Sequence, residues 1–496
     1  MHGNGGTFFW TICYFTVLLG MSVYGLHRYF IIFLYFRNRH LSPPPPQRFQ
    51  ELPTVTVQLP IYNEVYVVER LLAAVSRIDY PRDRLEIQIL DDSTDETKNI
   101  ADREATRLRQ AGFQVQVLRR PNRIGFKAGA LNHGLSQAQG EFFLILDADF
   151  IPPPHILQET IHFFSDPAIG MIQTRWGHIN RSYSWLTRAQ AILLDGHLLL
   201  EQTARSRTGR FFNFNGTAGV WRRSCIEQAG GWQHDTLTED LDLSYRAQLN
   251  GAKFHFLSHI VTPAELPIDM SGFKSQQHRW TKGSIQTCKK VLPLIWKSRL
   301  PWWIKAEAII HLTSNFAYLL LALLCVLLHP SGIRDAADWQ RTAMIDLPIF
   351  CATTLSVAVF YLCAQRELYP KHWKREIFFF PFVLALGIGL SIGNARAVLE
   401  AVFNHKSAFA RTPKYGFTCG KRSAKRNRYA AFRNALPIVE LFFAIYFSYF
   451  VVTALGNREF LSLPFLMLFQ VGFAYVALTS LRERALRRHW SVREVL

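Results

Sequence analysis

The longest apolar segment, residues 7–36, restricts the possible folds of this chain more than any other feature. A single His-Arg pair interrupts it, and it is longer than the roughly 20 residues that a helix needs to cross a bilayer. No small-residue cleavage site follows, whereas a basic cluster over residues 37–40 does. We therefore expect an uncleaved transmembrane anchor over residues 1–40 with a cytosolic C-terminal end. The proline-rich residues 41–53 should form a stiff linker.

Four further apolar runs in the second half of the chain predict membrane spans. They cover residues 302–329, 345–364, 435–455 and 460–480. Each is close to the length that a bilayer requires. We therefore expect two transmembrane helices within residues 301–364 and two within residues 435–480.

The apolar run 377–394 differs from these four because both of its flanks are basic. The segment that follows, 396–433, holds ten Lys and Arg against one acid, and basic flanks favour the cytosolic side. We therefore predict a re-entrant or interfacial region over residues 377–404. Five spans then leave the basic loop 405–433 and the basic tail 481–496 in the cytosol, whereas six would place the tail outside.

The composition supports a soluble domain combined with membrane helices. Hydrophobic residues make up 49% of the chain, and the formal net charge is +19. No nucleic-acid-binding motif accompanies this charge, so we expect no nucleic-acid partner and assign the charge to membrane lipid at the cytosolic face. The seven cysteines are scattered, which argues against a disulfide framework. We expect an integral protein of the inner or plasma membrane with its catalytic domain in the cytosol.

Residues 54–270 alternate between strand-like and helix-like patterns. The predicted strands are Thr54–Leu59, Leu85–Leu90, Gln114–Leu118, Glu141–Leu146 and Ile169–Thr174, and the predicted helices are 64–78, 94–111 and 127–138. This alternation is typical of an α/β domain whose mostly parallel, Rossmann-like sheet has helices on both faces. Ligands of such sheets bind beyond the carboxyl ends of the strands.

Three polar clusters fall at those predicted strand ends. They are Pro60-Ile61-Tyr62-Asn63-Glu64, Asp91-Asp92-Ser93-Thr94-Asp95 and Asp147-Ala148-Asp149. The last cluster follows the apolar run 142–146, and two carboxylates so close together repel each other. Hard oxygen ligands suit Mg²⁺ or Mn²⁺, which would also hold a phosphate. An acidic loop without a metal is the simpler interpretation of this motif taken alone.

Two more features are compatible with a bound nucleotide. One carboxylate of Asp91 and Asp92 could accept a hydrogen bond from a base or a ribose, although capping of the next helix is an equally simple interpretation. Lys127, at a predicted helix start, could place a cation near a pyrophosphate. A surface lysine remains the alternative.

Carboxylates also open a predicted helix at Thr238-Glu239-Asp240. Capping explains acids at a helix N-terminus, but it does not explain the aromatic and small residues of the preceding segment 211–219. A sugar acceptor needs aromatic faces for stacking and small residues for close approach. A carboxylate at this position could therefore act as a general base on an acceptor hydroxyl.

The segment 271–300 is predicted to form interfacial helices and contains Gln276-Gln277-His278-Arg279-Trp280. The guanidinium of Arg279 suits a diphosphate leaving group, and the indole of Trp280 suits the face of a sugar. In isolation this stretch would be an ordinary amphipathic helix face.

The order of these motifs resembles a known signature. Asp91-Asp92, Asp147-Ala148-Asp149, Thr238-Glu239-Asp240 and Gln276-x-x-Arg279-Trp280 are similar to the D, DxD, TED and QxxRW motifs of membrane-embedded, processive family 2 glycosyltransferases. These enzymes include cellulose synthase, the plant mannan synthases and their bacterial relatives. The resemblance covers about residues 50–415 and implies a GT-A-type fold for residues 54–270.

The resemblance extends to a segment of the basic loop. Phe409-x-x-Thr412-x-Lys414 is similar to the gating-loop motif FxVTxK of cellulose synthases, although Arg411 replaces the valine. A gating role for Phe409, Thr412 and Lys414 therefore rests on a partial match.

The resemblance implies a role for each matching position. Tyr62, Glu64, Asp91 and Asp92 would contact the donor nucleotide, Lys127 and Asp147 the diphosphate, Asp147 and Asp149 the metal, Glu239, Gln276 and Arg279 the diphosphate or acceptor end, and Trp280 the terminal acceptor sugar. Asp240 would be the general base.

The sequence thus predicts an inverting transferase that extends a β-linked glycan from UDP-glucose or GDP-mannose and moves the growing glycan across the membrane. A transferase that adds one sugar to a membrane lipid, similar to ceramide glucosyltransferases, is the alternative. A transporter or a non-catalytic scaffold would require every acidic motif to be a mere helix cap. The motifs do not distinguish the donor sugar, the linkage or the oligomeric state.

Overall fold

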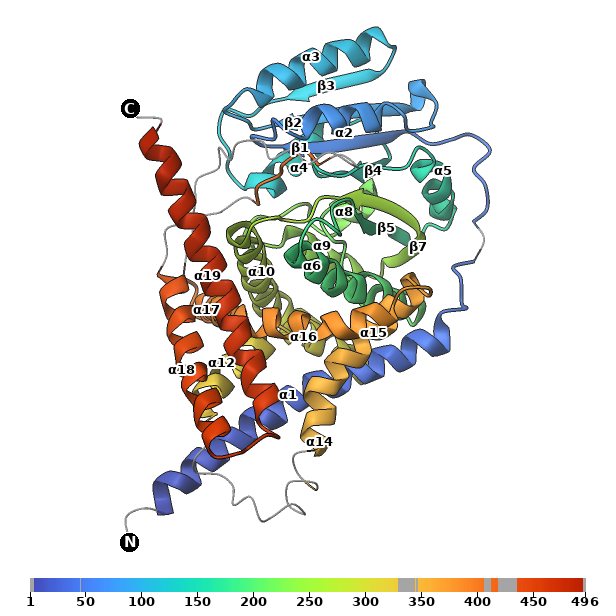
Figure 1. Cartoon of the computed structure of the whole chain (residues 1–496). Helices are drawn as coiled ribbons and strands as arrows, with labels where there is room; N and C mark the ends of the chain where they lie inside the picture. Colours follow the sequence, from blue (N-terminus) through green and yellow to red (C-terminus); the bar gives the residue numbers. More distant parts are fainter. Residues whose placement is uncertain are drawn as a thin grey trace.

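The computed structural model describes residues 4–44, 46–328, 344, 347–405, 412–417 and 435–493. It places a sheet domain, residues 55–264, against a set of long apolar helices (Figure 1). The N-terminal end of the first helix lies far from the sheet, and the last helix runs back alongside the sheet domain.

Seven strands form one sheet in the order β3-β2-β1-β4-β6-β5-β7. Their bounds are β1 Val55–Ile61, β2 Leu85–Asp91, β3 Gln114–Leu118, β4 Phe142–Ile145, β5 Ile169–His178, β6 Gly219–Arg222 and β7 Lys253–Ala264. All neighbours pair in parallel except β6, which is antiparallel to both β4 and β5. The mostly parallel sheet is therefore confirmed, and five of its strands lie where the sequence predicts them.

Two strands are absent from the prediction. The strand β6 has only four residues and lies at the end of an aromatic and small-residue stretch that carries no regular alternation. The strand β7 is long but mixes His, Ser, Thr and Pro with its apolar residues. Both are held by pairing with β5, a contact between segments far apart in the chain.

Helices cover both faces of the sheet. Their bounds are α2 Val68–Val75, α3 Thr97–Gln110, α4 Phe126–Gln137, α5 Ile156–Thr160, α6 Trp185–Asp195, α7 Gln202–Arg207, α8 Arg223–Gln228, α9 Glu239–Leu249 and α10 Met270–Lys297, with short 3₁₀ turns η1 Arg82–Arg84 and η2 Ile161–Ser165 and a π-helical segment η3 Gly196–Glu201. One apolar layer packs the sheet against α2, α3 and α5. The other packs it against α4, α8 and α9.

The strand β4 shows why the apolar run 142–146 fixes this architecture. Phe142 and Leu144 lie in the first apolar layer, whereas Phe143 and Ile145 lie in the second. Successive side chains of a strand point to opposite faces, so an unbroken apolar run fits a strand covered on both sides. Each of these fully buried side chains stabilises the fold by about 1.5–3 kcal/mol, and the chain leaves the core at Asp147.

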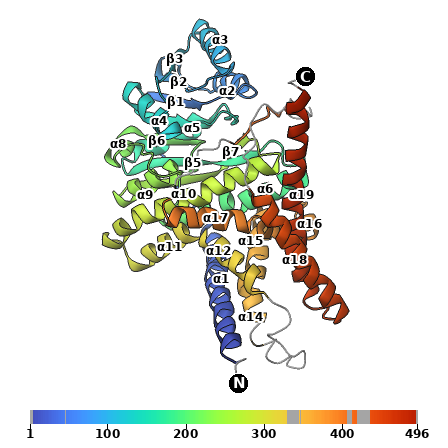
Figure 2. The same ribbon diagram turned by 90° about the vertical axis from the view of Figure 1, so that its left-hand side faces the viewer.

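The remaining helices form the apolar part of the molecule. They are α1 Asn4–Asn38, α11 Trp302–Thr313, α12 Phe316–Leu327, α14 Leu347–Phe350, the π-helical η5 Cys351–Leu355, α15 Ser356–Leu368, α16 Lys374–Gly389, α17 Ser391–Val402, α18 Leu436–Gly456 and α19 Leu463–Arg493. Figures 1 and 2 show α1, α14 and the lower end of α18 extending away from the sheet.

Five segments of the described chain are long and apolar enough to cross a membrane. They are Phe9–Asn38, Leu347–Leu368, Lys374–Val402, Leu436–Gly456 and Leu463–Leu486. In addition, α11 and α12 form an apolar pair bent by 56°. The predicted spans within residues 301–364 therefore correspond to a bent pair and to one long helical segment.

The predicted interfacial region 377–404 corresponds to α16 and α17. Half of its most apolar window is buried inside the protein, the largest share among the five segments. Trp185 of α6 packs against Phe379 of α16 with 5.8 Å between the ring centroids. Length and composition alone would also allow this segment to cross a bilayer, so the choice between five and six spans stays a prediction.

Candidate active site

One cavity lies beyond the carboxyl ends of β1 and β4. The predicted site residues that line it are Tyr62, Glu64, Asp92, Lys127, Asp147, Asp149, Glu239, Asp240, Gln276, Arg279, Trp280, Thr412 and Lys414. Within the described part of the chain, Asp91 alone among the predicted residues is not in this lining, and Phe409 lies outside the described residues. The polar clusters that the sequence places at separate strand ends therefore share one cavity.

Asp91 is buried behind the cavity wall. Its carboxylate accepts hydrogen bonds from Arg119 Nε at 2.8 Å and from the backbone N–H of Ser93 at 3.0 Å. Its neighbour Asp92 forms an ion pair with Arg120 and does line the cavity. A nucleotide contact through Asp91 or Asp92 stays a prediction, and the structure adds an arginine partner to each carboxylate.

Tyr62 lines the cavity directly after β1. The guanidinium carbon of Arg123 lies 3.3 Å from the centroid of its ring, within the range of a cation–π contact. The next residue, Asn63, has a positive φ of 55°, and its backbone N–H donates to Ser93 Oγ at 2.9 Å. This uncommon conformation for a residue other than glycine is thus held by a hydrogen bond to the loop after β2.

Lys127 lies in the first turn of α4 and reaches across the cavity floor. Its Nζ lies 2.5 Å from Asp147 Oδ1 and donates to the backbone carbonyl of Gly216 at 2.7 Å. Burial lowers the pKa of Lys127, but the carboxylates of Asp147, Glu239 and Asp240 outweigh burial and leave that pKa raised. The site therefore holds a fixed positive charge next to the first carboxylate of the Asp-Ala-Asp motif.

The second carboxylate of that motif is deeper in the protein. Asp149 is 1% exposed, and its Oδ2 accepts hydrogen bonds from Lys414 Nζ at 2.7 Å and from the Glu265 backbone N–H at 3.2 Å. Its other oxygen, Oδ1, is buried and has no hydrogen-bond partner among the residues that the structure describes. An unpaired buried carboxylate oxygen beside a more exposed Asp147 suits a divalent cation.

Protein side chains alone would not complete such a metal site. No group of three or more His, Cys, Asp or Glu residues is arranged to hold a metal within the described ranges of the chain. The two aspartates can supply two carboxylates, so the remaining oxygen ligands must come from a bound phosphate or from water.

Asp240 lies in the first turn of α9, which also carries Glu239. Burial and the repulsion of the Glu239 carboxylate raise the pKa of Asp240 to about 7, and burial raises the pKa of Glu239. The backbone N–H of Leu241 donates to Asp240 Oδ1 at 2.9 Å. A carboxylate with a pKa near neutrality that faces a cavity is suited to take a proton from a hydroxyl group.

Gly216 leaves room for the side chains of Asp240 and Lys127 beside it. Its φ is +80°, and a Cβ atom at this position would lie 2.9 Å from Asp240 Oδ2. The same residue offers its carbonyl to Lys127. Any residue other than glycine would combine backbone strain with a clash against the carboxylate.

The helix α10 carries Gln276, Arg279 and Trp280 into the cavity. Burial lowers the pKa of Arg279, while Glu239, Asp147 and Asp240 act in the opposite direction. This guanidinium thus lies among three carboxylates, and its fork geometry is suited to a diphosphate.

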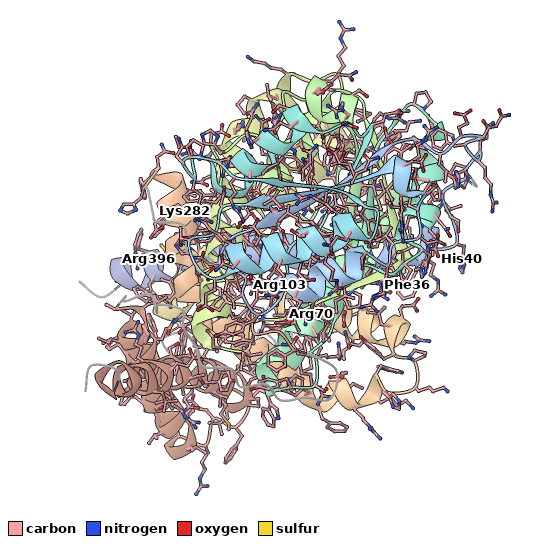
Figure 3. The ribbon with its side chains drawn as sticks, turned by 90° about the horizontal axis from the view of Figure 1, so that it is seen from above. Phe36, His40, Arg70, Arg103, Lys282 and Arg396 are labelled. Atoms are coloured by element: carbon pink, nitrogen blue, oxygen red, sulfur yellow. The ribbon has the colours of Figure 1, made fainter. Side chains whose placement is uncertain are left out.

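The first half of this helix is held by its own N-cap and by two other helices. The Asp269 carboxylate accepts the N–H of Gly272 at 2.6 Å, and Glu483 of α19 accepts the N–H of Met270 at 2.6 Å. Further along, Lys282 of α10 contacts Glu400 of α17 at 3.0 Å. Glu400 also contacts Arg396 of its own helix at 2.8 Å, and Figure 3 labels Lys282 and Arg396. The helices α17 and α19 therefore help to determine where α10 places its cavity residues.

The segment 412–417 closes one side of the cavity. The Glu265 carboxylate accepts the backbone N–H groups of Tyr415, Gly416 and Phe417 at 3.1, 3.2 and 2.7 Å. It also pairs with Arg70 of α2, the residue labelled in Figure 3, at 2.8 Å. Since Lys414 of the same segment contacts Asp149, the segment is attached directly to the candidate metal site.

Sequence analysis missed several of these residues. Arg119, Arg120 and Glu265 carry no motif that distinguishes them from surface charges. Only the folded chain pairs the two arginines with Asp91 and Asp92 and brings Glu265 to the cavity lining. Gly216 lies in the segment 211–219 that the sequence associates with an acceptor. A glycine between polar residues signals a turn, but no rule predicts its contact with Asp240.

Three comparisons identify related proteins. Residues 53–283 match the family model described as "Glycosyltransferase like family 2". Over 441 residues, the chain is 32% identical to glucomannan 4-beta-mannosyltransferase 7 of Arabidopsis thaliana, covering 86% of this chain and 77% of that protein. It is 36% identical over 326 residues to probable glucomannan 4-beta-mannosyltransferase 10 of the same plant, covering 62% of this chain.

The chain spans only part of the length of some relatives, and its fold is similar to that of a solved structure. The chain spans 58% of the second relative's length and 49% of glucomannan 4-beta-mannosyltransferase 2 of Arabidopsis thaliana, to which it is 41% identical over 52% of this chain. The fold is similar to that of a mannosyltransferase from Pyrobaculum calidifontis in complex with GDP-Man and Mn²⁺. The TM-score is 0.52 at 20% identity, over 79% of this chain and 99% of the other. This likeness confirms the GT-A-type fold.

Proposed function

The chain belongs to the mannan synthase type of family 2 glycosyltransferases, and we propose that it extends a β-linked glycan from a nucleotide sugar. The observation that carries this proposal is the convergence of Asp147, Lys127, Asp240 and Arg279 on one cavity. These residues supply a general base on one side and a set of diphosphate-binding groups on the other.

In this mechanism, Asp240 removes the proton from an acceptor hydroxyl. The hydroxyl oxygen then attacks the anomeric carbon of the donor sugar, and the bond from that carbon to the diphosphate breaks. A single displacement of this kind inverts an α-linked donor to a β-glycoside. The pKa of about 7 for Asp240 leaves a substantial fraction ionised at neutral pH and keeps the group basic enough to accept the proton.

The opposite side of the cavity binds the leaving group. The cationic side chains of Lys127 and Arg279 stabilise the negative charge that grows on the departing diphosphate. Asp147 and Asp149 would hold a divalent cation, Mg²⁺ or Mn²⁺, which supplies further charge neutralisation at the phosphate oxygens. The unpaired Oδ1 of Asp149 supports this assignment.

The proposed donor is GDP-mannose, because the named relatives are glucomannan 4-beta-mannosyltransferases and the fold neighbour is a mannosyltransferase in complex with GDP-Man. UDP-glucose is the competing donor, since glucose and mannose differ at one hydroxyl group. The proposed acceptor is the end of the growing glycan, stacked on Trp280 in the cavity.

The membrane assignment is part of the proposal. Five apolar segments would cross the bilayer with the sheet domain on the cytosolic side: α1, the bent pair of α11 and α12, the segment Leu347–Leu368, α18 and α19. The long apolar segments and the position of α19 beside the sheet domain support this arrangement. The growing glycan would leave along these helices, and the segment 412–417 would control access to the donor.

Purified full-length protein incubated separately with GDP-mannose and UDP-glucose in the presence of Mn²⁺ tests the proposed function. We expect release of GDP and a product of many sugars that a β-1,4-mannanase degrades. A product that carries one added sugar on a lipid would support the single-transfer alternative. Release of neither nucleotide diphosphate would refute the proposed function.

A further inference from the structure

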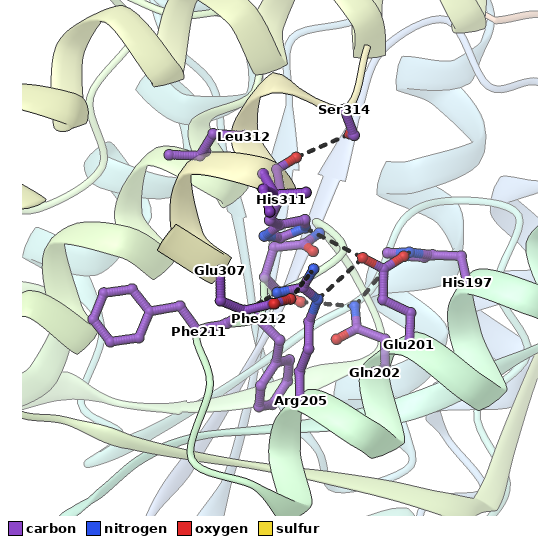
Figure 4. Close-up of polar contacts among 12 residues, drawn as sticks. His197, Glu201, Gln202, Arg205, Phe211, Phe212, Glu307, His311, Leu312 and Ser314 are labelled. Atoms are coloured by element: carbon purple, nitrogen blue, oxygen red, sulfur yellow. Dashed lines mark hydrogen bonds and ion pairs between the residues drawn. The ribbon is translucent and has the colours of Figure 1, made fainter. Parts of the chain in front are cut away.

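A chain of polar contacts connects the first helix to the sheet domain, outside the cavity. His27 of α1 lies 2.8 Å from Glu307 of α11, and Glu307 lies 3.0 Å from Arg205 of α7. Arg205 in turn lies 3.0 Å from Glu201, and Glu201 lies 2.9 Å from His197 (Figure 4). Five ionisable side chains from four elements thus form one continuous series, which we call the His197–Glu307 network.

The local backbone arranges this series. His197 and Glu201 belong to the π-helical segment η3, and Arg205 follows four residues after Glu201 on α7. Residues four apart lie on the same side of a helix, so the three side chains are stacked in a row. Short π-helical segments are rare and occur frequently at functional sites.

The network reaches the cavity through Asn215. His197 Nε2 lies 3.3 Å from Asn215 Oδ1, and Gln202 Nε2 lies 3.0 Å from the same oxygen. Asn215 lines the cavity, and the residue after it is Gly216, whose carbonyl accepts the hydrogen bond from Lys127 at 2.7 Å. A contact path therefore runs from α1 to the cation at the diphosphate site.

The buried charges of the network are better explained by a role in positioning other residues than by a contribution to the stability of the fold. Arg205 is 1% exposed and lies between two carboxylates. A buried ion pair is seldom more stabilising than packed apolar residues of similar size. Burial lowers the pKa of His197, but Glu201 outweighs burial and Arg205 and leaves it raised. Both ring nitrogens face oxygen atoms, Nδ1 at 2.9 Å from Glu201 Oε2 and Nε2 at 3.3 Å from Asn215 Oδ1, so a protonated ring can donate to both.

The other groups that face the network come from α9 and α11. His311 of α11 lies 3.9 Å from Glu201 and accepts or donates a hydrogen bond with the Tyr245 hydroxyl of α9 at 2.7 Å. The network is therefore in contact with two parts of the site. It reaches the loop at Gly216 through Asn215, and it reaches α9, which carries Asp240, through His311 and Tyr245.

We propose that His197 is a positioning residue that holds Asn215 and, through Gly216, places Lys127 for the donor diphosphate. This inference rests on the proposed function and deepens it, because it assigns to residues outside the cavity a role in nucleotide binding. The network also connects that role to α1 and α11.

The test measures binding of GDP, with Mn²⁺ present, to full-length protein and three single variants. His197→Ala removes the donor to Asn215, whereas His197→Gln keeps an amide N–H donor. His155→Ala is the matched control, because His155 and Glu159 form an exposed pair with the same four-residue spacing. We expect His197→Ala to weaken GDP binding by about tenfold, as loss of a charge-assisted hydrogen bond predicts. The control should bind like wild type, and His197→Gln should restore most of the affinity.

A double variant tests the route through Asn215. If His197 acts through Asn215, His197→Ala should add little to the loss caused by Asn215→Ala, and KM for the donor should rise more than kcat falls. Full additivity would overturn the inference. So would a folded His197→Ala protein with unchanged GDP binding, or a His197→Gln protein as weak as the alanine variant.

Thermal unfolding and size-exclusion profiles establish whether each variant is folded. If His197→Ala does not fold, the GDP affinity of His197→Gln is compared with that of wild type instead. If wild-type protein binds neither GDP nor UDP, the proposed function fails and the inference fails with it. If wild-type protein binds and transfers sugar while the His197 variants equal it, the inference alone fails.

Discussion

Replacement of Asp240 by asparagine should remove activity and stabilise the protein at the same time. The side chain keeps its size and can still accept the N–H of Leu241, but it can no longer take a proton. Loss of a general base reduces the rate by about 10²–10⁴-fold. We therefore expect Asp240→Asn to bind the donor with near wild-type affinity and to transfer sugar at least a hundred times more slowly.

The stability change follows from the raised pKa. In the folded protein, the Asp240 pKa is about 7 instead of 3.8, so the folded state holds a proton that the unfolded state has lost. Stability therefore falls as the pH rises from about 4 to about 7. At 1.36 kcal/mol for each pH unit, the ionised carboxylate destabilises the fold by at most about 4 kcal/mol above pH 7. Asparagine carries no charge and therefore removes this destabilisation.

Thermal unfolding of wild type, Asp240→Asn and the exposed control Asp83→Asn at pH 5 and pH 8 measures this effect. We expect the Asp240 variant to melt at a higher temperature than wild type at pH 8, by roughly 1 °C for each kcal/mol in a chain of 496 residues, with a smaller difference at pH 5. Because the Asp83 side chain is exposed and this variant keeps Asp240, its melting temperature should follow that of wild type at both pH values. Unchanged transfer activity, or a lower melting temperature of the Asp240 variant at pH 8, would refute the reasoning.

Three further predictions concern the cavity wall. Gly216→Ala should reduce transfer by more than about tenfold, because its Cβ would press on Asp240 in a left-handed backbone; steady-state kinetics that match wild type would contradict this. Glu265→Gln weakens the hydrogen bonds that attach the segment 412–417, so limited proteolysis should cut this segment faster than in wild type. Equal cleavage rates would contradict the attachment through Glu265. EDTA should abolish transfer and Mn²⁺ restore it, whereas Asp149→Asn should require at least tenfold more Mn²⁺; full activity in EDTA would exclude the metal.

The sequence predicts the sheet and the location of the site because both depend on local patterns. The run 142–146 has to be a strand covered on both faces, and the acids that follow it must then lie at a sheet edge. The first three helices of the domain follow from the same alternation. The antiparallel strand β6 could not be predicted, since four residues without alternation carry too little signal and their pairing with β5 is a long-range contact.

The charge partners of the site residues could not be predicted either. Asp91 and Asp149 each lie in a recognisable motif, yet Arg119 and Lys414 reach them only in the folded chain. The His197–Glu307 network shows the same limit, because its members are separated by up to 280 residues in sequence. A single sequence contains residue types and spacings, whereas these contacts depend on how α1, α7 and α11 pack together.

The stereochemistry of transfer tests the central claim most directly. The claim is that Asp240 and the diphosphate-binding groups act on opposite sides of the donor sugar in a single displacement. NMR spectra of the product formed from GDP-mannose or UDP-glucose report the configuration at the new anomeric carbon. The account predicts a β-glycoside from the α-linked donor. An α-glycoside would contradict it.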